Sequence, residues 1–430
     1  MGRLRGTHAA AASAAPPASF NCRPVDASSV SDHSTVRDPK WLHQHVRGIL
    51  NFYYPTCVDH RFGGYVPQMS DRDGHVYDGL HKSVVATARF VYNFSVGELL
   101  DGPDWCRSVA HHGVDFLLDA HRRADGGYPW LLAGREVEDS ARTCYAHAFV
   151  LLAFATAAKA GVPRARDHVA ETADCIDERF WESDHGLCRG KLDADWHPTE
   201  RYRGQNANMH VCEAMLAAHE ATGEERYLDR AATIAERLAR DLADAGDGLV
   251  WEHYTADWEF DWEYNRDQPE HLFRPWGYQP GHLLEWAKLL VRLDGHRERG
   301  WHLDRARRFF DAAVEQGWDA DGGGFVYTVD REGDPVVEDK YYWPLAEGFA
   351  AAARLAAVTD EDRYREWYDR IWAYAWEHVI NRRYGNWYGR LTPDNRLHDG
   401  IDATPKVKTD YHPVGCCYDV LRTLGGDGRS

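Results

Sequence analysis

Three histidines stand at positions where they could carry acid–base chemistry. His210, His282 and His412 each interrupt a helical pattern that is otherwise largely apolar. Imidazole titrates at about pH 6.5, so it can take and return a proton around neutrality. Glu285 follows His282 at an i, i+3 spacing, which directs both side chains to one side of a helix. Such groups are suited to moving a proton at a carbon next to a carbonyl.

Four further polar or aromatic residues occupy comparable places in other helical patterns, namely Arg89, Tyr145, Trp343 and Glu347. Aromatic walls suit the apolar faces of a sugar, whereas arginine and glutamate suit its hydroxyl groups. Each residue taken alone also has a structural explanation, such as a surface ion pair or a core aromatic with a satisfied polar tip. Their recurrence at matching places in a repeat favours a shared pocket.

The usual sequence signatures of metal and cofactor sites are missing. The chain has no HExxH, no CxxC pair and no EF-hand loop, and neither a Walker loop nor GxGxxG precedes a helix. We therefore predict a site that works with histidine and carboxylate groups, without a metal and without a cofactor.

A glycine-rich segment that reads as a β-hairpin recurs six times along the chain. The first copy is GGYVPQMSDRDG, residues 63–74, and the others begin at Gly126, Gly186, Gly248, Gly323 and Gly385. The spacing of roughly 60–75 residues indicates an internal repeat rather than isolated turns.

Two helical patterns separate each hairpin from the next. The predicted helices cover residues 39–54, 79–100, 104–121, 140–160, 164–181, 205–222, 224–243, 280–294, 301–317, 340–358, 361–380 and 410–423. Many carry apolar residues on more than one face, as helices do when they are packed on both sides. The pattern predicts an all-α fold, a single (α/α)6 barrel with short β-hairpins at one mouth, in which the helix after each hairpin belongs to the inner ring. An open solenoid is the alternative.

Composition limits the partners and the compartment. The chain has 430 residues and a net charge of −18, which argues against binding nucleic acid, and it lacks the long apolar run of a membrane span. Nine cysteines without CxxC spacing fit reduced thiols and a cytoplasmic location. Residues 1–38 are rich in Ala, Pro and Ser and read as a disordered or misassigned tail, leaving 39–430 as the catalytic domain. The oligomeric state, monomer or homodimer, stays open.

Six motifs, in order, resemble one known family over roughly residues 40–425. They are KSVVATARFVYNFS (82–95), CYAHAFVLLAFA (144–155), RGQNANMHVCEAML (203–216), FRPWGYQPGHLLEWAKLL (273–290), KYYWPLAEG (340–348) and KTDYHPV (408–414). The chain resembles the N-acylglucosamine 2-epimerase superfamily, and NANMH together with RPWGYQPGHLLEW is most similar to its aldose–ketose isomerase branch, the mannose isomerases. One departure is Ala146, where the second motif commonly has an acid.

The resemblance implies a mechanism and roles for individual residues. Mannose isomerases open the sugar ring and move the C2 proton to C1 through a cis-enediol. Carried onto this chain, His412 would be the base for that transfer and His282 the acid–base group for ring opening, with Glu285 orienting His282. The remaining implied substrate contacts are His210 and Arg89 at O1 and O2, Asn206 and Tyr145 nearby, Trp343 as a wall, and Glu347 at a hydroxyl or tuning His412.

Several functions remain compatible with these residues. The expected substrate is a monosaccharide, D-mannose giving D-fructose, and D-lyxose giving D-xylulose is also possible. A sugar 2-epimerase of the mannose or cellobiose type could use the same two histidines as bases on either side of C2. An (α/α)6 glycoside hydrolase would need two carboxylates beside the bond, for which Glu285 and Glu347 are the available pair. A binding module without chemistry is a third alternative, but it would not need three intact histidines.

Overall fold

The computed structural model describes residues 36–398 and 407–425, and most of them are helical. Six helices follow the glycine-rich segments or the C-terminal turn: α2 (Val84–Leu99), α4 (Cys144–Lys159), α6 (Gln205–Thr222), α9 (Pro280–His296), α11 (Tyr342–Thr359) and α13 (Tyr411–Leu424). Six others alternate with them: α1 (Pro39–Tyr53), α3 (Cys106–Phe116), α5 (Asp167–Arg179), α7 (Glu225–Ala235), α10 (Gly300–Gly317) and α12 (Asp362–Tyr374).

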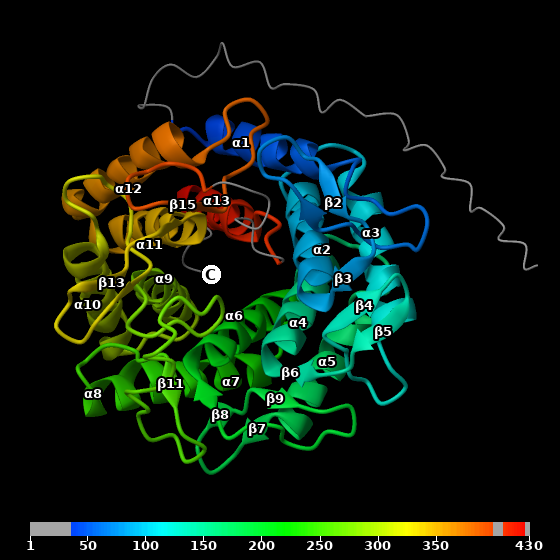
Figure 1. The fold of residues 1–430 in the computed structure, drawn as a ribbon, viewed down its shortest axis with the longest axis horizontal. Coiled ribbons are helices and arrows are strands. Elements are labelled where there is room, and N and C mark those ends of the chain that lie inside the picture. The colour runs from blue at the N-terminus through cyan, green and yellow to red at the C-terminus, as the bar shows by residue number, and fades with distance from the viewer. Residues whose placement is uncertain (1–35, 399–406, 426–430) are drawn as a thin grey trace, which may run out of the picture.

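The first set forms a closed inner ring. Each inner helix packs against the next in chain order, and α13 returns to contact α2, while every inner helix also packs against an outer one. Figure 1 shows the two concentric rings viewed along the bore. This closure confirms the predicted (α/α)6 arrangement and excludes an open solenoid, in which the first and last repeats would not meet.

Burial differs between the rings as the apolar patterns predict. Every residue of α2 from Val84 to Gly97 is buried, because this helix has the bore on one side and outer helices on the other. The outer helix α7 buries a single stripe at helical spacing, consisting of Tyr227, Leu228, Ala231, Ile234 and Ala235. Within the described residues, none of the helices is both long and apolar enough to span a membrane.

Predicted and observed helices differ mainly at their ends. The helix predicted from residue 79 begins at Val84, because residues 81–83 pair as strand β3 (His81–Ser83). Three outer helices end in wider π-helical turns, η3 (Leu117–His121), η4 (Glu236–Leu242) and η5 (Ala375–Val379), and η4 runs on into the short helix α8 (Ala243–Ala245). Most of the predicted tail, residues 1–35, lies outside the described residues. Val36 is buried, and the Tyr368 hydroxyl on α12 donates to its carbonyl oxygen at 2.8 Å.

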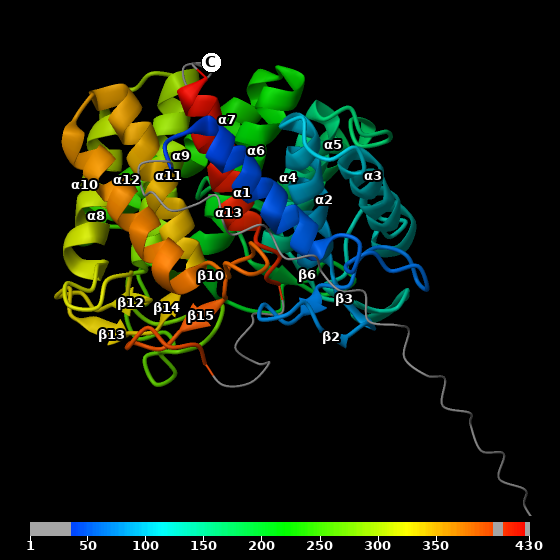
Figure 2. The ribbon, with the colours of Figure 1, turned by 90° about the horizontal axis from the view of Figure 1, so that it is seen from above.

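The short strands gather at one mouth of the barrel, as the repeats predict (Figure 2). Four pairs are hairpins: β1 (Gln68–Met69) with β2 (Val76–Asp78), β4 (Leu131–Ala133) with β5 (Glu136–Asp139), β7 (Trp181–Glu182) with β8 (Leu187–Cys188), and β12 (Thr328–Val329) with β13 (Pro335–Val337). Four antiparallel pairs join neighbouring repeats instead: β3 with β4, β6 (Arg142–Thr143) with β9 (Lys191–Leu192), β10 (Arg203–Gly204) with β11 (His253–Tyr254), and β14 (Lys340–Tyr341) with β15 (Arg390–Leu391). These four pairs therefore tie neighbouring repeats together around the mouth.

The recurring glycines allow the hairpin backbone to touch an outer helix. Gly64 has a φ of +67°, and a β-carbon there would lie 2.5 Å from the ring of Phe116 on α3. Gly324 repeats this geometry with a φ of +79° and a β-carbon position 2.5 Å from the ring of Tyr374 on α12. Both the left-handed backbone and the close approach require a residue without a side chain.

A buried cation two residues before an inner helix binds an acid at the start of the preceding hairpin. Lys82 contacts Asp59 at 2.7 Å, and Lys340 contacts Asp319 at 2.6 Å. We call this contact the hairpin clamp. The same clamp is formed by Arg142 with Asp125, by Arg203 with Glu182 and, with a phenol in place of the cation, by Tyr278 with Asp247.

The clamp in the first repeat is the most deeply buried. The Lys82 side chain is fully buried and also donates to the Tyr65 carbonyl oxygen at 2.8 Å. Burial acts to raise the pKa of Asp59, but the Lys82 ammonium group outweighs it and holds this pKa below its usual value. The two charges therefore depend on each other, because either one alone would be left without a partner away from water.

We expect Lys82→Met to destabilise the fold strongly, by about 3–5 kcal/mol, because it leaves the Asp59 carboxylate buried without its cation. The midpoint of urea unfolding, followed by circular dichroism, measures the loss. The matched control is Arg164→Met, which breaks surface ion pairs with Asp115 and Asp119 and should change stability by less than about 1 kcal/mol. Equal midpoints for the two variants would contradict the role of the clamp.

Candidate active site

A cavity at the hairpin mouth gathers the predicted residues from all six inner helices. Its free space is about 630 Å³, including the open entrance. Eight of the predicted site residues line it: Arg89, Tyr145, Asn206, His210, His282, Glu285, Trp343 and His412. Glu347 does not line this cavity but lies directly below it, against His412. All of them lie in the first two turns of their helices, so the cavity is built from the N-terminal turns of the inner ring.

His412 is held from below by a carboxylate and an ammonium group. Its Nδ1 lies 2.7 Å from Glu347 Oε1, and Lys288 Nζ lies 2.5 Å from the other oxygen of Glu347. Burial lowers the pKa of His412 to about 4, although Glu347 acts in the opposite direction. Burial acts to raise the pKa of Glu347, but Lys288 and His412 keep it below its usual value. At neutral pH this gives a neutral imidazole backed by a carboxylate.

His282 has a different partner from the one expected. Its Nδ1 lies 2.8 Å from Glu252 Oε1, and Gln205 lies beside both groups. Glu252 comes from the fourth glycine-rich segment, not from α9. The expectation that Glu285 orients His282 is therefore wrong, because Glu285 lies one turn further into the bore.

Glu285 instead faces His210 and the other buried carboxylates. Its Oε1 lies 3.7 Å from His210 Nδ1, which is also 3.3 Å from Glu213 Oε2. Neither Glu285 oxygen has a hydrogen-bond partner within the described residues. Burial, reinforced by the charge of Glu347, raises the pKa of Glu285 well above its usual value, which favours the neutral carboxyl group. Burial also lowers the pKa of His210, although Glu213 opposes the shift.

Aromatic rings and one arginine complete the walls. The Trp343 ring lies 5.0 Å from the His282 ring and 5.6 Å from the His412 ring, so it is close to both imidazoles. Arg89 donates to the Tyr145 hydroxyl at 3.0 Å and to the Val407 carbonyl oxygen at 3.1 Å. These contacts hold a positive charge at the side of the cavity.

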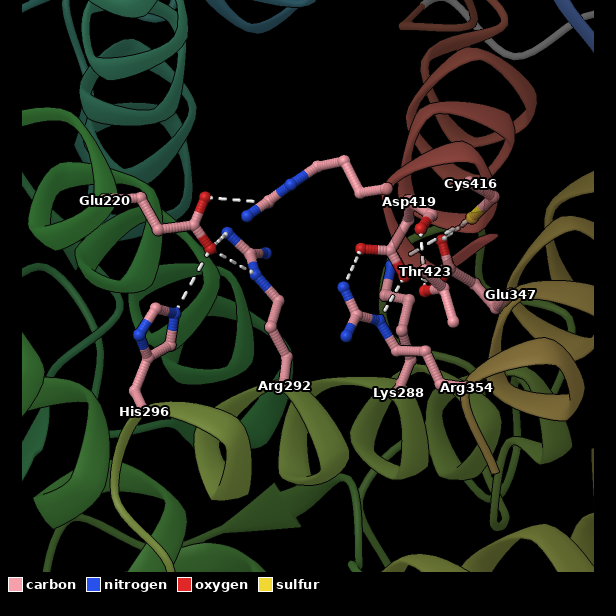
Figure 3. Close-up of polar contacts among 10 residues, drawn as sticks. Glu220, Lys288, Arg292, His296, Glu347, Arg354, Cys416, Asp419 and Thr423 are labelled. Carbon is pink, nitrogen blue, oxygen red and sulfur yellow. Dashed lines mark hydrogen bonds and ion pairs between the residues drawn. The ribbon is translucent and has the colours of Figure 1, made fainter. Parts of the chain in front are cut away.

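The floor of the site continues into a dense ionic network around a second cavity of about 530 Å³. Figure 3 shows Lys288 and Glu347 on one side of this network and Glu220 with Arg292 and His296 on the other. Glu220 also binds Lys159 and Arg422, and Arg354 forms an ion pair with Asp419. Because buried charges need partners, this network is what allows a charged layer to lie beneath the pocket.

The described residues include two groups with the donor types of a metal site. His210, Glu213 and Glu285 form one, and Glu285, Glu347 and His412 form the other, each with ligand atoms within 4.8 Å of one another. They fit a divalent cation poorly, because the Lys288 ammonium group already forms an ion pair with Glu347 at 2.5 Å and would repel a second cation there.

Sequence reasoning missed four residues that support the histidines: Glu213, Gln205, Lys288 and Glu252. Three of them lie inside the quoted motifs, and Glu213 follows His210 at the same i, i+3 spacing that drew attention to Glu285. Glu252 carries a weaker signal, since it is one of many acids in the hairpin segments and its contact with His282 depends on tertiary folding.

The fold and the cavity define a class: an (α/α)6-barrel protein with paired histidine and carboxylate groups at its hairpin mouth. The family model described as N-acylglucosamine 2-epimerase (GlcNAc 2-epimerase) matches residues 63–416. A D-mannose isomerase of Marinomonas mediterranea is 41% identical over 385 residues, which is 89% of this chain and 97% of that protein. A second, from Thermobifida fusca, is 37% identical over 82% of this chain and 87% of that protein.

Solved structures agree with the sequence relatives. A crystal structure of D-mannose isomerase has a TM-score of 0.88 and 40% identity, covering 90% of this chain and 99% of that one. A cellobiose 2-epimerase from Bacillus thermoamylovorans has a TM-score of 0.77 and 17% identity, covering 89% of this chain and 99% of that one, which shows the shared fold. The chain belongs to the N-acylglucosamine 2-epimerase family.

The burial of His412 predicts an unusual titration. We expect its imidazole to remain neutral from pH 8 down to about pH 5, because its pKa is lowered to about 4. Histidine NMR spectra recorded across this range measure the midpoint, and a His412→Gln variant identifies the resonance. A midpoint near the ordinary value of about 6.5 would show that the imidazole is not sealed from water.

Proposed function

We propose that the protein is a cofactor-independent aldose–ketose isomerase that converts D-mannose to D-fructose. The observation that carries the proposal is the pair of carboxylate-backed imidazoles, His282 and His412, which line one cavity together with the Trp343 indole. Relatives named D-mannose isomerase, 41% and 37% identical over most of the chain, support the same reaction. The eight described cysteines are free and buried, which supports work in a reducing cytoplasm.

Ring opening is assigned to His282. Its Nε2 takes the proton from the C1 hydroxyl group and a proton is returned to the ring oxygen, so the C1–O5 bond breaks and an aldehyde forms. The Glu252 carboxylate at Nδ1 stabilises the imidazolium that exists between these two transfers.

Proton transfer between carbons is assigned to His412. Its Nε2 removes the C2 proton, the electron pair forms the C1–C2 double bond, and O1 gains a proton from an acid, giving a cis-enediol. The same nitrogen returns its proton to C1 while the O2 proton passes back to the acid that protonated O1, so C2 becomes the ketone and both groups are regenerated. Arg89 and the neutral Glu285 lie on the cavity wall, where they can donate to the oxygens that gain negative charge.

Substituting either histidine should remove most of the turnover. We expect His412→Asn and His282→Asn each to lower kcat for mannose by about 10²–10⁴-fold, the usual contribution of a general acid–base group. Fructose formation measured by NMR gives the rate. His197→Asn is the control, because the His197 side chain is 75% exposed and should leave the rate unchanged. Near-native turnover in the His412 variant would contradict the proposal.

The identity of the product separates the isomerase from a 2-epimerase, which could use the same two histidines. With mannose in deuterated water, we expect fructose that retains part of the substrate hydrogen at C1, because one base carries it between adjacent carbons. Glucose as the sole product would favour the epimerase. D-lyxose giving D-xylulose is the second substrate to assay.

A hydrolase has less support from the site. Glu285 and Glu347 contribute ligand atoms within 4.8 Å of each other, but Glu347 is occupied by Lys288 and His412. A hydrolase needs two carboxyl groups free to flank the glycosidic bond. The resemblance to family 76 glycoside hydrolase structures, at 12% identity, concerns the fold alone.

A further inference from the structure

We propose that Glu252, anchored by Gln205, is a positioning residue that fixes the tautomer and the orientation of His282. The inference rests on the proposed isomerase activity, in which His282 handles the sugar oxygens. It assigns a role to a hairpin residue outside the inner helices that carry the rest of the site.

The Glu252 carboxylate contacts only one nitrogen of the His282 imidazole, Nδ1. Glu252 is 3% exposed and lies immediately before β11, and its Oε1 is 2.8 Å from Nδ1 of His282. His282 is itself 6% exposed and lines the sugar cavity. A contact through Nδ1 leaves Nε2 as the nitrogen that can face a ligand.

The orientation of Gln205 is settled by a neighbouring indole. Trp286 Nε1, which can only donate, lies 2.9 Å from Gln205 Oε1. The Gln205 amide nitrogen therefore points the other way, toward Glu252, whose two oxygens are each 3.1 Å away. Gln205 Nε2 also lies 2.9 Å from His282 Nδ1, so two nitrogens converge on one carboxylate.

This arrangement selects one tautomer of His282. The carboxylate accepts, and the Gln205 amide nitrogen cannot accept in its place, so Nδ1 must carry the hydrogen that Glu252 receives. Nε2 is then left with a free electron pair in the neutral imidazole, as a base requires. His412 and Glu347 also form an imidazole–carboxylate pair, at 2.7 Å, although Lys288 additionally binds Glu347.

The surroundings of Glu252 argue against a purely structural role. Hairpin-clamp acids such as Asp59 and Asp319 are neutralised by a lysine. In the described part of the chain, the Glu252 carboxylate receives hydrogen bonds from an amide and an imidazole and has no lysine or arginine partner. A buried carboxylate without a permanent cation costs stability. Its negative charge is balanced when His282 becomes an imidazolium, which is the state that ring opening requires.

The test compares Glu252→Gln with Glu259→Gln, the same change at an exposed position of the same hairpin segment. We expect Glu252→Gln to lower kcat by roughly 10²–10⁴-fold, to change KM by less than about threefold, and to leave the thermal midpoint equal or higher. The acid limb of the kcat profile should move to lower pH. Glu259→Gln should match the wild type in all four measurements.

Further measurements keep the test decisive. Glu252→Asp retains the charge at a shorter reach and should recover part of the lost kcat. In the wild type, ¹⁵N NMR should show His282 protonated at Nδ1, with this signal changed in Glu252→Gln. A Glu252→Gln enzyme with wild-type kcat and an unmoved acid limb would overturn the inference, as would His282 protonated at Nε2 in the wild type. Absence of isomerase activity in the wild type would overturn the proposed function instead, and the NMR result would still decide the tautomer.

Discussion

The hairpin clamp is the contact on which the rest of the architecture depends. An inner helix can occupy its place in a ring with many rotations about its axis, and apolar packing alone distinguishes them weakly when the helix is buried on all sides. Lys82 and Lys340 remove this freedom, because each is fixed to a hairpin acid just before its helix begins. Because these ion pairs are buried, displacing one partner would leave the other as an unpaired charge away from water, at a large cost in stability. The residues of the following two turns are thereby directed into the bore.

The direction of the inner helices then gives the bore two unlike ends. All six begin at the hairpin mouth, so their N-termini, which carry partial positive charge, converge on the cavity that contains His282 and His412 (Figure 2). The other end collects C-termini, and Lys159 and Arg422 lie there in the last turns of α4 and α13. Positive charge therefore faces the place where an enediol would gain negative charge, and cations compensate the opposite end.

The fold followed from the sequence because two independent periods agreed: helical apolar spacing within each repeat and glycine-rich hairpins between repeats. The cavity followed as well, since Arg89, His210 and His412 all lie in the first two turns of inner helices. The residues that support each histidine could not be predicted from the sequence. His282 and Glu285 share a face of α9, but the i, i+3 step also moves Glu285 one turn deeper, next to His210. The true partner, Glu252, reaches His282 from a hairpin whose register only the assembled ring determines.

Three buried glutamates in the bore, Glu213, Glu285 and Glu347, have unlike electrostatic environments. The pKa values of Glu213 and Glu347 are lowered against the effect of burial, that of Glu213 by His210 and Lys288 and that of Glu347 by Lys288 and His412. In the proposed reaction, a third carboxylate at Glu285 would oppose the negative charge of an enediolate. Burial and Glu347 instead raise the pKa of Glu285 and favour its protonated form. A protonated Glu285 can donate a hydrogen bond, whereas an ionised Glu285 would be repelled by Glu213 and Glu347. The charges of the ionic floor therefore influence the chemistry of the pocket above it.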